Sequence, residues 1–375
     1  MHHPGTRELT ARGFLVLGLN TRFENNESNV IFEDVALDVR AGVEFLKKQP
    51  GIEKVVLFGH SGGGATMTFY QAVAEMGPAA SQGKDKFVHG DDRNLSGLPP
   101  ADGVILADAH PGISVTILRA LDAMLIDEDD PSKLDPDLDP FSAASGYKAD
   151  EPFVYNTEFR QRYHQAQSDR MNRLIDKALK LKDNIAAGEH VYRDNDIFLV
   201  LRSRSGGLKN RDLSINDSTL RPRRLLKNDG TIVTQIIHSV REPDPPQDAD
   251  KRSGGALPFY STRVFTVRSF LSTIAIRSTN SIDGINWASS NNSVPNNLTN
   301  MTVPLLITAM GAHVFIRDNE IHYEMAASAD KEFIVFEGAT HNMSPYMPRH
   351  GEPELYSNVT RNYYDYVAQW INKRF

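Results

Sequence analysis

Residues 54–70 read Lys-Val-Val-Leu-Phe-Gly-His-Ser-Gly-Gly-Gly-Ala-Thr-Met-Thr-Phe-Tyr, and this stretch decides the fold of the chain. It opens with the short apolar run 55–58, whose length and composition are typical of a buried strand. The chain then turns through residues 59–63, three of which are glycine, and the run 65–70 can continue as a helix. A strand, a tight turn and a helix in this order form the unit from which parallel sheets are built.

The turn has the pattern Gly-x-Ser-x-Gly, with Ser61 at its centre. A serine in a strained turn needs small neighbours, and Gly59 and Gly63 allow the strand and the helix to approach without Cβ clashes. Placed between a strand and a helix, the pattern predicts a nucleophile elbow, in which the serine hydroxyl is lifted out of the sheet. The backbone N–H of Gly62 can then face a developing oxyanion. The alternative is an ordinary turn in which Ser61 only caps the helix.

The composition is that of a globular protein of 375 residues, of which 40% are apolar and 24% are charged. A net charge of −7 argues against nucleic acid or an anionic membrane as the main partner. The chain has no cysteine, which excludes disulfides, thiolate metal sites and cysteine nucleophiles. No apolar run approaches the ~18 residues of a membrane span, and no signal peptide is visible, so we expect a soluble chain.

Apolar strand-like runs alternate with helical patterns on both sides of the turn. The expected strands are 14–20, 55–58, 103–108, 303–308 and 333–336. Residues 32–48 carry apolar side chains at helical spacing, and the C-terminal residues 356–371 do the same. This alternation predicts an α/β fold with a doubly wound, mostly parallel sheet.

About 190 residues separate the strands expected at 103–108 and 303–308, far more than an ordinary crossover needs. This interval carries a long amphipathic helix at 162–187, strand-like runs at 197–201 and 263–267, and an Asp-Gly hairpin signal at 229–230. We therefore expect a mixed α+β cap over residues 113–302, inserted into a core formed by 1–112 and 303–375.

The pattern Gly59–Gly63, the strand that ends in Glu-Gly-Ala-Thr-His341, and the order of strands and helices between them resemble the α/β-hydrolase family. The resemblance covers about residues 1–112 and 303–375 but not the insertion. It implies that Ser61 is a nucleophile and that His341 is its general base. The same pairing follows from chemistry, because a serine hydroxyl is a poor nucleophile at neutral pH unless an imidazole takes its proton.

The acid that would orient the histidine is left open by the sequence. The family usually places it a few residues beyond a glycine such as Gly311, where this chain has Ala-His-Val-Phe. Glu320 lies further along, and Asp108 ends an earlier strand, a position that some lipase-like members of the family use. These two carboxylates are equal candidates, with Asp318 behind them. As alternatives, Asp108 could simply form a turn, and the other two could be charges near a helix start.

A second oxyanion donor is expected from the N-terminal loop His3-Pro4-Gly5, which resembles the family's early loop and would offer the N–H of Gly5 or a residue just beyond it. The strands that normally precede this loop in the family are not present, so we expect either a late start or a trimmed sheet. His60 lies within the elbow turn and is expected to shape the floor of the pocket.

No metal and no cofactor is expected. No group of His, Asp and Glu has the spacing of a metal site, and the adjacent His2 and His3 have the look of a chance pair. The glycines 62–64 lack the Lys-Ser/Thr that follows a phosphate-binding loop.

The sequence thus predicts a serine hydrolase that cleaves an ester or related acyl bond of a small to medium, apolar substrate. Two alternatives stay open: a C–C bond hydrolase, amidase or lactonase with the same triad, and a non-catalytic small-molecule-binding protein that has the same fold. The expected partner is a small-molecule substrate, and the sequence leaves formation of a homo-oligomer open.

Overall fold

The computed structural model describes residues 3–148, 153–203, 207–243, 261–349 and 354–375. Its centre is a six-stranded sheet with the strand order β1-β2-β7-β8-β4-β5. The first five of these strands are parallel, and β5 runs antiparallel to β4. Their bounds are β1 Val56–His60, β2 Gly103–Ala107, β7 Leu305–Met310, β8 Lys331–Phe336, β4 Arg223–Leu226 and β5 Ile232–Gln235. The expected α/β architecture with a mostly parallel sheet is confirmed.

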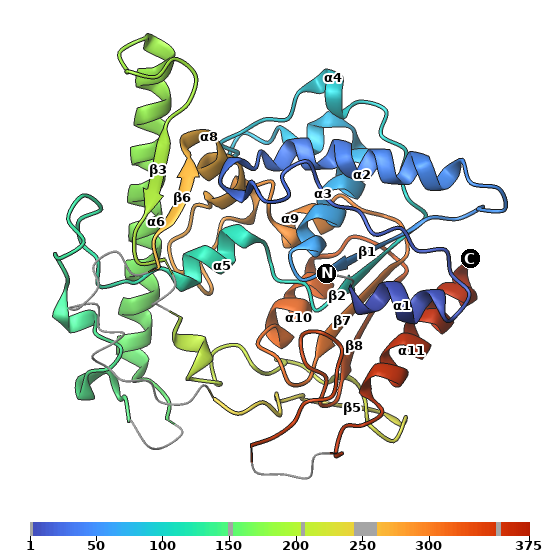
Figure 1. Cartoon of the computed structure of the whole chain (residues 1–375). Helices are drawn as coiled ribbons and strands as arrows, with labels where there is room; N and C mark the ends of the chain where they lie inside the picture. The colour runs from blue at the N-terminus through green and yellow to red at the C-terminus, as the bar shows by residue number, and fades with distance from the viewer. Residues whose placement is uncertain (1–2, 149–152, 204–206, 244–260, 350–353) are drawn as a thin grey trace.

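Helices cover both faces of the sheet (Figure 1). One apolar core lies between the sheet and three helices, α2 Phe32–Lys47, α3 Gly63–Met76 and α9 Val294–Leu298. A second core joins the other face to α1 Pro4–Thr10 and α11 Val359–Arg374. Helix α10 Ile316–Met325 packs against β7 and β8. Since residues alternate between the faces of a strand, β2 sends Val104 and Leu106 into the first core and Ile105 into the second.

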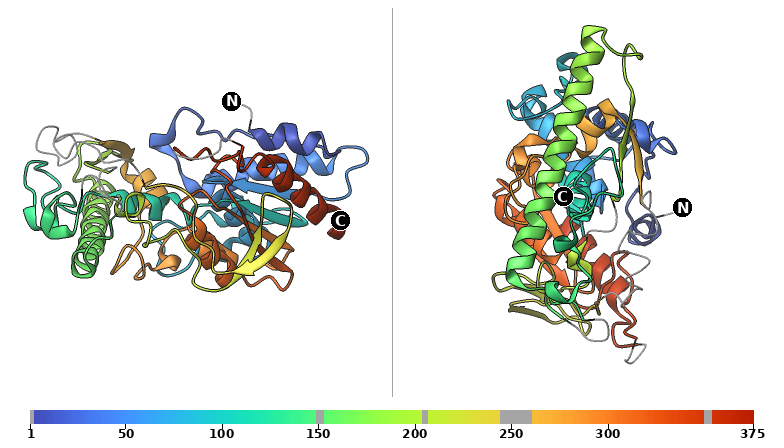
Figure 2. Two further views of the ribbon diagram at one scale, coloured as in Figure 1. Left: turned by 90° about the horizontal axis from the view of Figure 1, so that it is seen from below. Right: turned by 90° about the vertical axis from the view of Figure 1, so that its left-hand side faces the viewer.

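Part of the interval 113–302 has its own apolar core. The helices α5 Ile113–Ala120 and α6 Thr157–Ala187 enclose it, together with the antiparallel pair β3 Ile197–Val200 and β6 Arg263–Thr266. The short α8 Val267–Ser269 follows β6, and the similarly short α4 Asp92–Leu95 precedes β2. Figures 1 and 2 show α6 at the end of the molecule remote from α11. The long helix expected at 162–187 is confirmed and begins five residues earlier.

The hairpin at 223–235 differs from the expectation for this interval. Its turn has the predicted Asp-Gly form, and Gly230 has a φ of 88°. The two strands do not stay with the expected cap, because β4 pairs in parallel with β8 and extends the central sheet. Residues 113–302 are therefore not wholly separate from the core sheet.

The strand expected at 14–20 is not formed. Leu15 is 59% exposed, and the side chains of Leu17 and Leu19 lie on Gly42 of α2 instead of joining a ladder. This segment and β1 both line an apolar cavity of about 450 Å³, which separates them. An apolar run becomes a strand only where a partner edge lies within hydrogen-bonding distance, and here the nearest edge, β1, lies across the cavity.

Candidate active site

The carboxyl ends of β1, β2, β7 and β8 meet at one edge of the sheet, because these strands are parallel and adjacent. Polar residues lie just beyond these strand ends: Ser61 and Asp108 directly follow β1 and β2, and the loops after β7 and β8 carry His313 and His341. In open α/β sheets this edge is where ligands bind.

The turn after β1 holds Ser61 in a left-handed conformation with a φ of 54°. Its N–H donates to the carbonyl of Ala107 at 3.1 Å, which fixes the turn to β2. A Cβ at Gly59 would lie 2.7 Å from the carbonyl oxygen of Gly63, so that position accepts only glycine. A non-glycine residue with positive φ is strained, and such strain is concentrated at functional sites. The N–H of Gly62 makes no backbone hydrogen bond within the described residues and remains available at the start of α3.

Asp108 is fully buried and also has a positive φ, 46°. Its Oδ1 accepts the N–H of Met310 at 3.2 Å, and its Oδ2 lies 2.7 Å from Nδ1 of His341. Burial opposes ionisation of this carboxyl, but the proximity of the His313 and His341 imidazoles and the hydrogen bond to His341 outweigh it and hold the pKa of Asp108 below its ordinary value. The side chain is therefore a carboxylate that can accept from an imidazole.

Two imidazoles approach the same oxygen of Asp108. Nδ1 of His313 also lies 2.7 Å from Oδ2, but it has no hydrogen bond, so only the contact with His341 has hydrogen-bond geometry. The two rings stack with centroids 4.3 Å apart. With Nδ1–H of His341 donating to Asp108, its Nε2 is free to accept a proton. The Ser61 hydroxyl makes no hydrogen bond to this ring within the described residues.

A chain of imidazoles connects the N-terminal loop to the same place. The N–H of Gly5 donates to Nδ1 of His3 at 3.0 Å, Nε2–H of His3 donates to Nδ1 of His60 at 3.0 Å, and Nε2–H of His60 donates to the carbonyl of His341 at 2.8 Å. Burial, followed by the proximity of His341, lowers the pKa of His60 to about 4 and also lowers that of His3. The two rings are therefore neutral, and they fix the backbone of His341 next to the elbow.

His110 lies on the other side of the elbow. Its Nδ1 accepts the N–H of Gly112 at 3.1 Å, which leaves the proton on Nε2. That Nε2 would lie 3.2 Å from a Cβ built on Gly62. Burial, followed by the charge of Lys209, lowers the pKa of His110 to about 4, so the ring is neutral. The two sequence neighbours of Ser61 thus contact different histidines: His60 contacts His341, and Gly62 faces His110.

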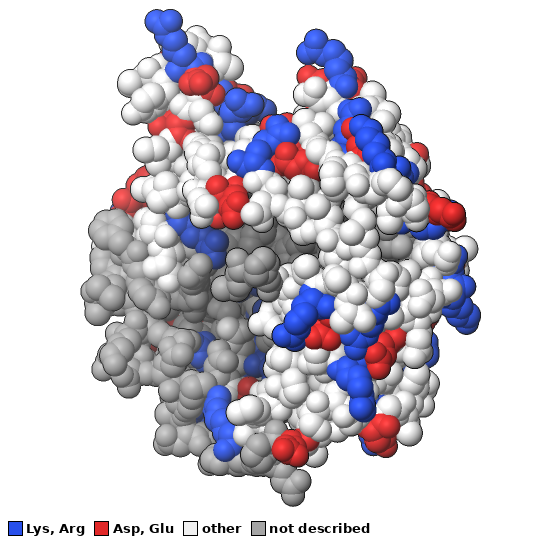
Figure 3. All heavy atoms as spheres, turned by 45° about the vertical axis from the view of Figure 1, so that its right-hand side comes forward, with Lys and Arg blue, Asp and Glu red and all other residues white. Residues whose placement is uncertain are grey.

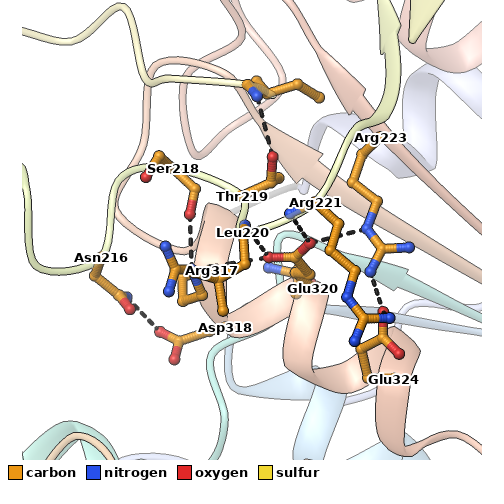
Figure 4. A network of polar contacts seen from close by, with 12 residues as sticks. Asn216, Ser218, Thr219, Leu220, Arg221, Arg223, Arg317, Asp318, Glu320 and Glu324 are labelled. Atoms are coloured by element: carbon orange, nitrogen blue, oxygen red, sulfur yellow. Dashed lines mark hydrogen bonds and ion pairs between the residues drawn. The ribbon is translucent and has the colours of Figure 1, made fainter. Parts of the chain in front are cut away.

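The other two candidate acids do not contact His341 and belong to a separate network on α10 (Figure 4). Glu320 accepts the N–H groups of Leu220 at 2.6 Å and Arg221 at 3.1 Å and pairs with Arg223 at 2.9 Å. Asp318 pairs with Arg119 at 2.8 Å and accepts from Asn216 at 3.0 Å. Of the three acids that the sequence left open, only Asp108 contacts the imidazole of His341 in the described residues.

The expected second oxyanion donor is not available in this arrangement. The N–H of Gly5 is used by the ring of His3, and the N–H of Thr6 donates to the carbonyl of His3 at 3.0 Å. His3 caps α1 through these contacts. Of the two expected oxyanion donors, only the N–H of Gly62 has no backbone hydrogen-bond partner within the described residues.

One group of side chains in the described residues could hold a metal ion. Asp108, His313 and His341 each offer one ligand atom, and these atoms lie within 4.8 Å of one another. The sequence did not indicate this group, because its members follow three different strands and have no common spacing. The roles of His313 and His110 were missed for the same reason, although each lies a few residues beyond a strand that the sequence analysis expected.

Residues from the interval 113–302 reach this edge of the sheet. The N–H of Val240 donates to the carbonyl of Gly311 at 2.8 Å, and the Asn216 amide donates to the carbonyl of Val314 at 2.9 Å. Lys209, in the short turn Leu208–Asn210, places its ammonium 4.9 Å from the centroid of the Phe315 ring. The insertion therefore contributes side chains beside the loop that carries His313.

Figure 3 shows one face of the molecule, on which Lys and Arg alternate with Asp and Glu among the described residues. Nucleic-acid binding usually requires a face of one sign. Within the described residues, the structure contains no helix with the length and apolar character that crossing a membrane requires. No protein-family model matches the chain, and no curated protein is significantly similar to it. The geometry of the site is therefore the basis for a functional proposal.

Proposed function

We propose that the protein is a serine hydrolase of the α/β-hydrolase type that cleaves an ester or related acyl bond. The observation that carries the proposal is the hydrogen bond of 2.7 Å between a fully buried carboxylate, Asp108, and Nδ1 of His341, beside a serine held in a strained turn. A carboxylate, an imidazole and a serine in this order are the parts that activate a hydroxyl for attack on a carbonyl carbon.

In the first half of the proposed reaction, Oγ of Ser61 attacks the carbonyl carbon while Nε2 of His341 takes its proton. The negative charge on the carbonyl oxygen is met by the N–H of Gly62 at the start of α3. The intermediate collapses, the bond to the alcohol oxygen breaks, and His341 returns the proton to the leaving alcohol. The result is an acyl-enzyme on Ser61 and one molecule of alcohol.

In the second half, water attacks the acyl carbon while His341 again accepts a proton. The bond to Oγ breaks, and the proton passes from His341 to Ser61, which restores the enzyme and releases a carboxylic acid. Asp108 stays ionised throughout, holds the tautomer with Nδ1–H, and stabilises the imidazolium that forms. The bond between nucleophile and base is often long before substrate binds and tightens with it, in keeping with a Ser61 hydroxyl that makes no hydrogen bond to His341 within the described residues.

The test is turnover of short-chain 4-nitrophenyl esters by the wild type and by Ser61→Ala. We expect hydrolysis by the wild type and a loss of at least 10³-fold in kcat for the variant, with unchanged circular dichroism. A wild type that is folded but hydrolyses none of these esters, or a Ser61→Ala variant with full activity, would contradict the proposal.

A further inference from the structure

Lys209 is a cation beside the proposed catalytic site that has no anionic partner within the part of the chain that the structure describes. Its ammonium lies 4.9 Å from the centroid of Phe315, and that ring lies 4.6 Å from the ring of His313 and 5.7 Å from the ring of His341. The charge of Lys209 also acts on His110, whose Nε2 faces Gly62. The ammonium therefore lies near His110 and Phe315, and the ring of Phe315 contacts both His313 and His341.

The carboxylates near Lys209 already have partners. Asp318 pairs with Arg119, and Asp217 pairs with Arg241. Within the described residues, the ammonium of Lys209 has no hydrogen bond and no ion pair. The face of Phe315 attracts the ammonium, but this cation–π contact contributes only about 0.5–2 kcal/mol and does not neutralise its charge.

The surroundings of Lys209 disfavour its charge when no anion is bound. Burial, only partly offset by Asp318, lowers the pKa of the ammonium to about 8. A partly buried cation without a paired anion is unfavourable, and one that lies beside the proposed catalytic site is suited to bind a charged ligand.

We propose that Lys209 binds a second, uncleaved carboxylate of the substrate, so that the preferred substrates are esters that carry a free carboxylate. This inference rests on the proposed hydrolase function. It replaces the wholly apolar substrate that the sequence suggested with an amphipathic one, whose apolar part lies on Phe315 and whose anionic end meets the ammonium. Lys209 is then a residue for substrate specificity and takes no part in the chemistry.

The experiment compares matched esters with and without a carboxylate. Mono-4-nitrophenyl glutarate is paired with 4-nitrophenyl hexanoate, which is neutral and of similar length, and 4-acetoxybenzoate is paired with phenyl acetate. The two pairs place the carboxylate on the acyl side and on the alcohol side. The variants are Lys209→Met, Lys209→Arg and, as a control, Lys133→Met, whose lysine is exposed and paired with Asp127 at 2.8 Å.

For the wild type we expect a higher kcat/KM for the anionic member of at least one pair. Lys209→Met should lower that kcat/KM by about 10- to 100-fold, mainly through KM, and should leave the neutral esters within about threefold. Lys209→Arg should keep a preference for the anionic ester, and added salt should weaken it. Lys133→Met should behave as the wild type.

Equal changes for anionic and neutral esters in Lys209→Met, or no preference in either pair for the wild type, would overturn the inference while leaving the hydrolase proposal intact. A wild type that hydrolyses none of the four esters would count against the hydrolase proposal instead. In that case, calorimetric titration of monomethyl glutarate into the wild type and into Lys209→Met decides the inference. Binding that is lost in the variant supports it, and equal binding or none overturns it.

Discussion

Asp108 and Glu320 are both carboxylates buried beside the central sheet, but different partners hold them. Asp108 follows β2 and meets two imidazoles, those of His341 and His313. Glu320 lies on α10 and meets the guanidinium of Arg223 and two backbone N–H groups from 220–221. An imidazole can take up and release a proton, whereas the guanidinium of arginine stays charged.

The comparison shows that the partners of a buried carboxylate distinguish a structural role from a role in proton transfer. At Glu320 every partner is a permanent donor, so the network fastens the segment before β4 to α10 (Figure 4). At Asp108 the partner is itself an acid and a base, so a proton can move at the far side of its ring. Burial alone does not separate these roles, because both side chains are almost fully buried. The kind of partner separates them.

The largest expected effect is on catalysis by Asp108→Asn. Loss of the carboxylate removes the acceptor that holds the His341 tautomer, and kcat should fall by about 10³- to 10⁴-fold. Glu320→Gln, the matched control, should keep kcat within about tenfold because Glu320 does not contact the imidazole. Both values are measured with 4-nitrophenyl esters. A greater loss for Glu320→Gln in a folded protein would reverse the roles given to the two carboxylates.

The next effect is on stability, where Glu320→Gln should have a larger effect than it has on kcat. Glu320→Gln removes one of the two carboxylates that pair with the partly buried Arg223, while Glu324 remains, and it takes a charged acceptor from the N–H groups of 220–221. The free energy of unfolding should therefore fall by about 2 kcal/mol. Chemical denaturation of the wild type, Glu320→Gln, Arg223→Gln and the double variant measures the coupling. If the two single changes add without any coupling in the double variant, the pair does not stabilise the fold as described.

The pH dependence of stability separates the imidazole region from the arginine region. The folded-state pKa of His60 and of His110 is about 4, below the ordinary value of 6.5, so between these values the unfolded chain binds more protons. Stability that is complete above pH 6.5 should therefore be lost as the pH falls to about 4, by on the order of 2 kcal/mol per histidine.

Asp318 should not contribute to that loss. Burial opposes its ionisation, but Arg119 and Lys209 outweigh this and lower its pKa, so its contribution is present above the unfolded value of 3.8 and is lost only at lower pH. Denaturation at pH 7, 5 and 4 checks both statements, and His110→Gln should flatten the decline. A curve for this variant that is as steep as that of the wild type would contradict the assignment.

The smallest expected effect distinguishes the two imidazoles at Asp108. Nδ1 of His313 lies 2.7 Å from Oδ2 of Asp108 but makes no hydrogen bond within the described residues, so His313→Gln should change kcat by less than about tenfold. His341→Gln should lose at least about 10³-fold, because it removes the proposed general base. Comparable losses in the two variants would mean that both rings take part in proton transfer.

The sequence predicted those elements whose form is decided by a local pattern of residues. The elbow around Ser61, the strands before Asp108 and His341, and α6 each lie within a short segment whose apolar spacing or glycines decide its form. The strand expected at 14–20 was wrong because a strand also needs a partner edge, and β1 lies across a cavity from this segment. The pairing of β4 with β8 was missed because it joins residues about 110 positions apart.

The acid partner could not be chosen from the sequence for a similar reason. Asp108 and Glu320 are both plausible at the level of strand order, and only the side-chain contacts show which one meets Nδ1 of His341. His313 and Lys209 carry no motif at all. Their importance arises from the fold, which brings a loop after β7 and a turn of the insertion to one ring, Phe315.

The most direct measurement is covalent labelling of the folded protein with a fluorophosphonate, followed by peptide mass spectrometry. We predict a single modified residue, Ser61, with no label in Ser61→Ala, slow labelling in Asp108→Asn and nearly normal labelling in Glu320→Gln. A well-folded wild type that takes up no label, or a label on another serine, would contradict the central claim that Ser61, His341 and Asp108 act together.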